Sequence, residues 1–249
     1  MRLMKLADFY PLPRQLVENE VKVLGRLMDD PYITREHPNF AVAARRYYDL
    51  YRGLKGGFEF WSYLDVYHSQ MPKRGKTIRG RNQPNLRLFI GSVIELNGKS
   101  YGNISYCLIV CRLKSKPSAI LRKFHFDVTS SAVGGQVRRQ QHPRCHLQYC
   151  GGMPPFDLGI TKAQLQNMHM GLDEPRIFFW PMSLALLLDM TLHEFPDVAS
   201  AKFRATPEWR GTIRENEALL LRRFYQGCID VIADNAHENK TLADEFYVA

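Results

Sequence analysis

Apolar residues in the first quarter of the 249-residue chain recur at helical spacing. The spacing predicts a helix from about residue 13 to 28, ended by the run Asp29-Asp30-Pro31, and a second helix from about 39 to 54. The aromatic segment that follows, FEFWSYLDVYH, is compatible with either a helix or a strand. This part of the chain, residues 1–71, is therefore predicted to be mainly helical.

The middle of the chain has a different pattern, with short β-branched or alternating runs that predict strands. These runs are residues 88–96, 104–113, 120–128, 144–149 and 176–180. Asn97-Gly98, between the first two, is a hairpin turn signal. Most connections are too short to hold a crossover helix, so the sheet is expected to be antiparallel.

Helical spacing returns near the C-terminus. Ser183 is placed to cap a helix that reaches Phe195, and Thr206-Pro207 begins the last long helix. The stripe predicted to be buried on this last helix consists of Trp209, Ile213, Leu220, Phe224, Cys228 and Val231. The polar tail after Asn235 is expected to fray.

Helices, then strands, then helices are typical of the α+β class. We expect one domain over residues 1–249, with a helical part (1–71), a basic sheet region (72–181) and a second helical part (182–249). The predicted architecture is a twisted antiparallel sheet with the N- and C-terminal helices packed on one face. The other face is expected to be open and basic.

Charge is concentrated in the middle of the chain. Residues 66–156 hold fifteen Lys or Arg and two acids, a local charge of +13, whereas the remainder carries −4. A field of this kind indicates a polyanionic partner, and RNA is favoured over DNA. The exposed, Gly- and Pro-containing loop at 72–85 is the predicted phosphate-contacting arm. The basic residues assigned to nucleic-acid contact are Lys73, Arg74, Lys76, Arg79, Arg81, Arg138 and Arg139.

Two predicted strands carry candidate chemistry. In RKFHFDV, period-two alternation places His125 and Asp127 on the face opposite Phe126, and in PRCHLQYCGG it places Arg144 and His146 opposite Leu147. If the strands are neighbours, these polar residues share one surface with Gln148, and His142 lies just upstream. Two histidines and an arginine suit metal-independent phosphodiester cleavage, with Asp127 orienting a histidine. The alternative is a pair of solvated strands with ordinary polar residues.

Metal binding is a rival use of the same segment. His142, Cys145, His146 and Cys150 are zinc-type ligands, but they lack the two separated ligand pairs of a structural zinc site. Cys145 and His146 would also point to opposite faces of a strand. A magnesium-dependent nuclease needs several carboxylates, and this stretch offers Asp127 and Glu95. We therefore expect no metal and no other cofactor.

The aromatic residues and the Asp189–His193 pair are interpreted as parts of the fold and not of a functional site. Aromatic residues between Tyr47 and Tyr67 could stack on single-stranded bases, but core packing beneath the sheet is favoured. Asp189 and His193 have the spacing of an i,i+4 helical pair. The chain has no HExxH, GxxxxGK[ST] or GxSxG motif. Five cysteines and no secretory signal or membrane-length apolar run predict a reduced, cytoplasmic protein without a membrane partner.

Residues 120–195 contain His142-Pro143-x-x-His146-Leu147, then Pro175-Arg176-Ile177, then an apolar helix. This pattern resembles uncharacterised bacterial proteins that are similar to toxin–antitoxin and phage-defence components. The resemblance implies that His142, His146 and Arg176 belong to one site, and it allows for a partner protein. It departs from the expected pattern at Gln148, where a histidine was expected.

The combined hypothesis is a nucleic-acid-binding protein with ribonuclease-type cleavage, acting as a bacterial toxin or defence effector. His146 would serve as general base or acid, His125 or His142 as its partner, and Arg144 or Arg176 as the phosphate stabiliser. The alternative is a non-catalytic subunit of a larger complex that docks nucleic acid or an acidic protein on its basic face.

Overall fold

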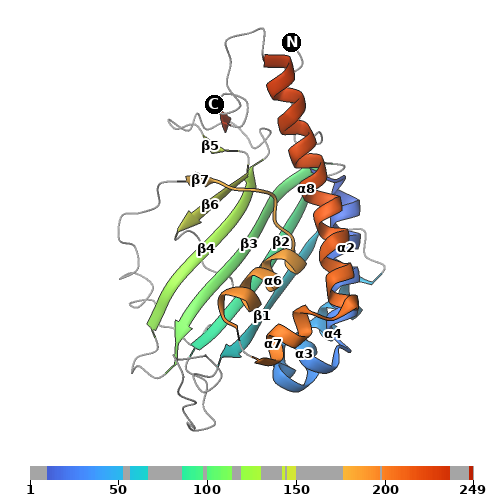
Figure 1. The fold of residues 1–249 in the computed structure, drawn as a ribbon, viewed down its shortest axis with the longest axis vertical. Helices are drawn as coiled ribbons and strands as arrows, with labels where there is room; N and C mark the ends of the chain where they lie inside the picture. The colour runs from blue at the N-terminus through green and yellow to red at the C-terminus, as the bar shows by residue number, and fades with distance from the viewer. Residues whose placement is uncertain are drawn as a thin grey trace.

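The computed structural model describes residues 10–52, 57–66, 86–97, 100–113, 119–129, 142–143, 145–149, 176–196, 198–235 and 247–248. Within these ranges the fold is α+β, as the order of predicted elements indicated (Figure 1). A twisted antiparallel sheet forms one layer, and the helices from both ends of the chain lie against one of its faces.

The main sheet has six strands in the order β1-β2-β3-β4-β6-β7, and every neighbouring pair is antiparallel. The strands are β1 (Phe58–Val66), β2 (Leu86–Asn97), β3 (Ser100–Arg112), β4 (Ala119–Thr129), β6 (Cys145–Tyr149) and β7 (Arg176–Phe178). Asn97 pairs with Ser100, so β2 and β3 form the tight hairpin that Asn97-Gly98 predicted. Strand order therefore follows chain order, which is a meander.

The helical layer is built from both ends of the chain. Its elements are α2 (Pro13–Leu27), α3 (Pro31–Glu36), α4 (Pro38–Tyr51), α6 (Leu184–Glu194), α7 (Val198–Arg204) and α8 (Pro207–Asn235). Helix α6 contacts β2 and β3, α4 contacts β1, and α2 and α8 pack on α6 from outside. Local signals begin these helices, because Ser183 Oγ caps α6 and Pro207 starts α8.

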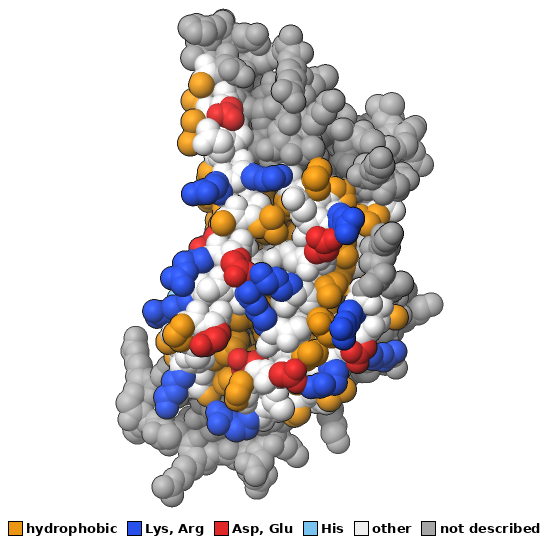
Figure 2. Space-filling view, turned by 90° about the vertical axis from the view of Figure 1, so that its right-hand side faces the viewer, with side chains coloured by type: hydrophobic (Ala, Val, Ile, Leu, Met, Phe, Trp, Pro, Cys, Tyr) orange, Lys and Arg blue, Asp and Glu red, His pale blue; other side chains and the backbone are white. Residues whose placement is uncertain are grey.

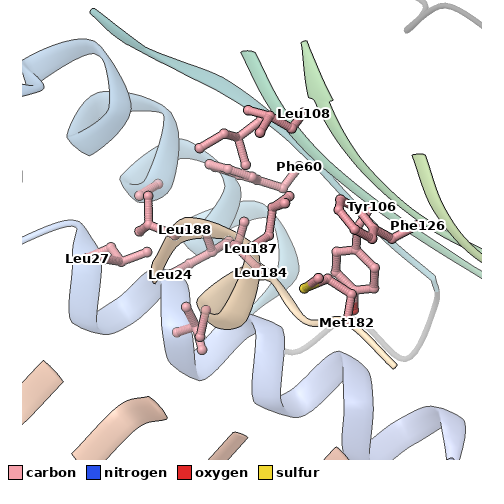
Figure 3. Packing of buried hydrophobic residues seen from close by; sticks show 14 of the residues in the cluster. Leu24, Leu27, Phe60, Tyr106, Leu108, Phe126, Met182, Leu184, Leu187 and Leu188 are labelled. Carbon is pink, nitrogen blue, oxygen red and sulfur yellow. The ribbon is translucent and has the colours of Figure 1, made fainter. Parts of the chain in front are cut away.

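The core lies between α6, α2 and the sheet. Figure 3 shows Leu184, Leu187 and Leu188 of α6 between the sheet residues and Leu24 and Leu27 of α2. The sheet contributes one face of β1, β2, β3, β4 and β6, including the fully buried Phe60 and Tyr106. Helix α6 is apolar nearly all round because it is covered on both sides, by the sheet and by the outer helices.

Three sequence expectations need correction. The segment FEFWSYLDV forms strand β1, so the N-terminal part is not wholly helical. Its period-two burial shows that alternation, rather than helical spacing, was the informative pattern. Helices α3 and α7 were not predicted, because each is too short for periodicity to be recognised. The tail contains strand β8 (Tyr247–Val248), which pairs with β5 (His142–Pro143) in a separate two-stranded sheet.

Among the helices of the described ranges, none combines the length and the hydropathy that a bilayer crossing requires.

Candidate active site

The register of the sheet aligns the candidate residues in two rows that cross the strands. The histidine row runs from β1 to β7 through Trp61, Gly91, Cys107, His125, Gln148 and Arg176. The aspartate row, two residues along, runs through Glu59, Val93, Ser105, Asp127, His146 and Phe178. Residues directly opposite each other in an antiparallel pair have Cβ atoms about 5 Å apart. From β1 to β4, where the side chains of the rows are described, both rows occupy the sheet face away from the helices.

This pairing matches the predicted register of β4 and β6. Phe126 lies opposite Leu147 and Val128 opposite Cys145, so the apolar positions of both strands share the core face. Asp127 therefore lies opposite His146, and His125 opposite Gln148. Arg176 follows Gln148 on the next strand, at the edge of the sheet. A shift by one residue would have turned Leu147 away from the core.

His125 is nearly buried and lies against a cysteine. Its side chain is 9% exposed, and its Nε2 is 3.4 Å from Sγ of Cys107, the residue opposite it on β3. Cys107 is 1% exposed. Sequence reasoning missed this cysteine, although the period-two alternation of CLIVC offered a signal for its face.

Charged side chains surround this pair. Burial raises the pKa of the Cys107 thiol to about 12, while the charge of Lys123 acts to lower it and that of Asp127 to raise it. Cys107 is consequently a neutral thiol rather than a nucleophile at ordinary pH. Lys123 is 5% exposed and Asp127 is half-buried, so a buried cation and a carboxylate flank the histidine along β4.

The expectation that this face is open is wrong for the residues described on β1 to β4. Phe89, Ile109 and Cys111 are buried on it, with Trp61 and Tyr63 packed against them. Strands β2 and β3 carry apolar residues on both faces, as strands buried on two sides do. The runs LFIGSVI and CLIVC already had this composition. The open face was expected from the apolar and polar alternation of β4 and β6, and β2 and β3 do not share that alternation.

One basic residue of the central segment is neutralised within the sheet. Arg87 donates from Nε and Nη2 to the carboxylate of Asp65, at 2.7 and 2.9 Å, and its guanidinium lies 3.8 Å from the centre of the Tyr63 ring. The hydrogen bonds that Arg87 donates to Asp65 are the largest cause that raises the pKa of Arg87. This arginine is therefore committed to a structural ion pair.

Strand pairing does not place the other predicted site residues in either of the two rows. The backbone of His142 lies in β5, which pairs with β8 and also contacts β7. His142 therefore belongs to a different sheet from His125 and His146. The other candidates lie outside the described residues; they are Arg144 and the nucleic-acid contacts Lys73, Arg74, Lys76, Arg79, Arg81, Arg138 and Arg139.

The zinc-type donor set is split by the strand. Cys145 is 3% exposed in the core cluster and lies opposite Val128, whereas His146 occupies a position on the other face. Cys145 and His146 therefore cannot share one ion without a break in the strand. Among the described residues, no three His, Cys, Asp or Glu side chains are grouped as metal ligands would be.

The aromatic cluster is divided between the two faces. Tyr47 packs edge-on against Phe60 and Tyr51 against Phe58, on the helical side of the sheet. These contacts agree with core packing. Trp61 and Tyr63 lie on the other face, and Tyr67 lies outside the described residues.

Asp189 and His193 do not form the simple helical pair that their spacing indicated. Both bind Arg204 of α7, which donates from Nε and Nη2 to Asp189 at 2.9 Å each and from Nη1 to Nδ1 of His193 at 2.8 Å. Trp209 Nε1 adds a hydrogen bond to Asp189 at 2.8 Å. Burial acts to raise the pKa of Asp189, but these bonds and the charge of Arg204 hold it below its ordinary value.

Comparison with protein-family models, with curated proteins and with solved structures found no significant match to this chain.

Proposed function

We propose that this protein binds RNA and cleaves it without a metal ion, and that the β4, β6 and β7 residues of the histidine and aspartate rows form its active site. The observation that carries the proposal is the β4–β6–β7 register, in which Asp127 lies opposite His146 and Arg176 follows His125 and Gln148 in one row. The β4 and β6 residues of these rows lie within residues 66–156, the segment that carries a local charge of +13. The resemblance of residues 120–195 suggests a toxin or defence effector as the biological setting.

In the proposed reaction, the imidazole of His146 takes the proton of a ribose 2′-hydroxyl, and the oxygen attacks the adjacent phosphorus. Asp127 orients and stabilises the imidazolium that forms. Arg176 or Arg144 stabilises the charge on the phosphorane oxygens. A second histidine, His125 or His142, protonates the departing 5′ oxygen, which leaves a 2′,3′-cyclic phosphate and a 5′-hydroxyl.

A second candidate is a non-catalytic subunit that docks nucleic acid or an acidic partner protein. The burial of His125 beside Cys107 favours it, because a histidine that is 9% exposed exchanges protons with a substrate less easily than an open one. Under this alternative, the histidine row is part of the packing of the sheet and the basic segment alone provides the interaction.

The first prediction tests cleavage directly. Purified protein with EDTA should cut a labelled single-stranded RNA and leave the matching DNA and a 2′-O-methyl RNA intact, because both analogues lack the 2′-hydroxyl nucleophile. His146→Ala should lower the cleavage rate by about 100- to 10,000-fold while the RNA affinity stays within a few-fold. Single variants His125→Gln and His142→Gln identify the second histidine.

The matched control is His193→Gln, which removes an exposed histidine on α6, on the helical side of the sheet. It should cut RNA at the wild-type rate. RNA binding without turnover in the wild-type protein would reject the cleavage proposal and support the docking subunit. Cleavage that survives His146→Ala would reject the assigned residues.

A further inference from the structure

A pocket with an unusual concentration of arginine lies in the helical layer. It has a volume of about 420 Å³, opens to solvent and is lined by Arg204, Arg210 and Arg214 together with Asp189. These residues come from α6, α7 and α8, the side of the sheet away from the proposed active site. With one carboxylate against three guanidiniums, the charged lining has a net charge of +2.

The three arginines differ in how they are held. Arg204 is fixed by two hydrogen bonds to Asp189 and one to His193, so its guanidinium is a preorganised wall of the pocket. Asp189 is in turn held by Trp209. Arg210 and Arg214, by contrast, are exposed, and neither side chain has a hydrogen bond or ion pair within the described part of the chain.

Arg210 and Arg214 are also four residues apart on one helix, which places their side chains on the same side. Two like charges at this spacing repel each other, and neither guanidinium is held in an ion pair within the described residues. Lys22 and Arg26 of α2, by contrast, both form ion pairs with Glu215 of α8. Figure 2 shows this face as a mixture of acidic and basic side chains. The pocket is thus a local excess of positive charge on a mixed surface.

The rest of the lining is apolar. Ala201, Ala205 and Ile213 complete the walls, so a ligand that fills the pocket meets both cations and a small hydrocarbon surface. Guanidinium groups bind phosphate through paired hydrogen bonds. The volume is larger than a bare phosphate requires and suits a phosphate with an organic group attached.

We infer that this pocket binds a phosphomonoester, with the phosphate held by Arg210 and Arg214 beside Arg204 and the organic group resting on Ala201, Ala205 and Ile213. The source of the phosphate is a free nucleotide or the phosphorylated 5′ end of a nucleic acid. The inference is independent of the cleavage proposal, because it concerns binding at the helical layer and requires no turnover.

Calorimetric titration of the full chain tests the inference with four probes: adenosine 5′-monophosphate, adenosine, and one short oligonucleotide with either a 5′-phosphate or a 5′-hydroxyl. A DNA oligonucleotide is used so that cleavage cannot interfere. Binding should require the phosphate. The double variant Arg210→Gln/Arg214→Gln should weaken it at least tenfold, and Arg210→Gln alone should weaken it less.

Arg222→Gln/Arg223→Gln is the matched control, because it removes the same charge from exposed positions farther along α8. It should leave the affinity within about twofold. Binding of the mononucleotide identifies a free nucleotide as a sufficient ligand, and binding of the phosphorylated oligonucleotide alone identifies a nucleic-acid end. Equal affinity for adenosine and its monophosphate, no saturable binding of any probe, or an equal loss in the control would overturn the inference.

Discussion

At the scale of single residues, Glu20 is the most unusual group in the core. It is fully buried on α2 and accepts a hydrogen bond from the Tyr106 hydroxyl at 2.7 Å and from the backbone N–H of Leu184 at 3.2 Å. One carboxyl group thereby links a helix, a strand and the first turn of α6. Burial raises its pKa to about 7, although the bonds from Tyr106 and Leu184 act to lower it.

This shift predicts a pH dependence of stability. The folded protein holds the Glu20 proton more tightly than the unfolded chain does, so the stabilisation is complete below the ordinary carboxyl pKa and is lost as pH rises through about 7. Between pH 5 and 8 the free energy of unfolding should fall by on the order of 2 kcal/mol from this group. Glu20→Gln should abolish this component, as measured by urea unfolding at several pH values.

Glu18→Gln removes an exposed carboxylate from the same helix and serves as the control, since Glu18 forms a surface ion pair with Arg14. Its pH profile should follow that of the wild-type protein. An unchanged slope in Glu20→Gln would show that the buried carboxyl does not titrate in this range.

At the scale of the elements, β1 and β2 fit together through a glycine. Gly91 lies opposite Trp61, and a Cβ atom placed on Gly91 would come within 2.0 Å of Cζ3 of the indole. The ring thus covers the glycine on the face that holds the histidine row. An aromatic side chain over a strand glycine compensates for the side chain that the glycine lacks.

Gly91→Ala should therefore destabilise the protein by about 1–3 kcal/mol, because the indole has to leave its position. Gly211→Ala is the matched control: Gly211 lies in α8 and a Cβ there would meet no atom within 4 Å. That change should stabilise the protein by up to about 1 kcal/mol, since alanine favours the helix. Thermal unfolding measures both. Equal stability of the two variants would contradict the close packing of Trp61 on Gly91.

At the scale of the whole molecule, the positive charge is concentrated in the middle third of the sequence. The +13 of residues 66–156 contrasts with −4 elsewhere, and the helical face in Figure 2 is mixed in sign. Where the structure describes the central segment, Arg87 is neutralised by Asp65 and Lys123 is buried. Arg112 and Arg122 are exposed, and the seven residues assigned to nucleic-acid contact lie outside the described residues; five of them, Lys73, Arg74, Lys76, Arg79 and Arg81, belong to one predicted loop.

RNA affinity should consequently fall steeply with salt, because phosphate contacts release counterions. Changing the five loop residues to Gln should weaken binding at low salt and reduce the slope of log K against log salt by up to about 3.5, at roughly 0.7 per lost contact. Fluorescence anisotropy at several salt concentrations measures both quantities.

A control of equal charge replaces Arg46, Arg52, Lys202, Arg222 and Arg223, which are exposed on the helices, with Gln. It should change the slope much less than the loop variant. The same slope in both variants would mean that RNA responds to net charge and not to the loop.

The sequence by itself determined the elements that have a strong local period. Helices α2, α6 and α8 were predicted close to their observed bounds from apolar spacing, Ser183 and Pro207. The face on which each residue of β4 and β6 lies also followed from the sequence, because Phe126 and Leu147 both require the core face and a shift of one residue would expose them. A shift of two residues would keep both on the core face, so the alignment of Asp127 with His146 was decided by the tertiary structure.

Only the tertiary structure decided which residues from distant parts of the chain meet. Cys107 lies against His125 because β3 is the neighbour of β4. The sheet face away from the helices is buried on β2 and β3 because these strands carry apolar residues on both sides. Arg204, Arg210 and Arg214 surround one pocket because α7 turns back against α6 and α8. Periodicity reports which side of an element is buried, but it carries no information about the side chain that another element brings to it.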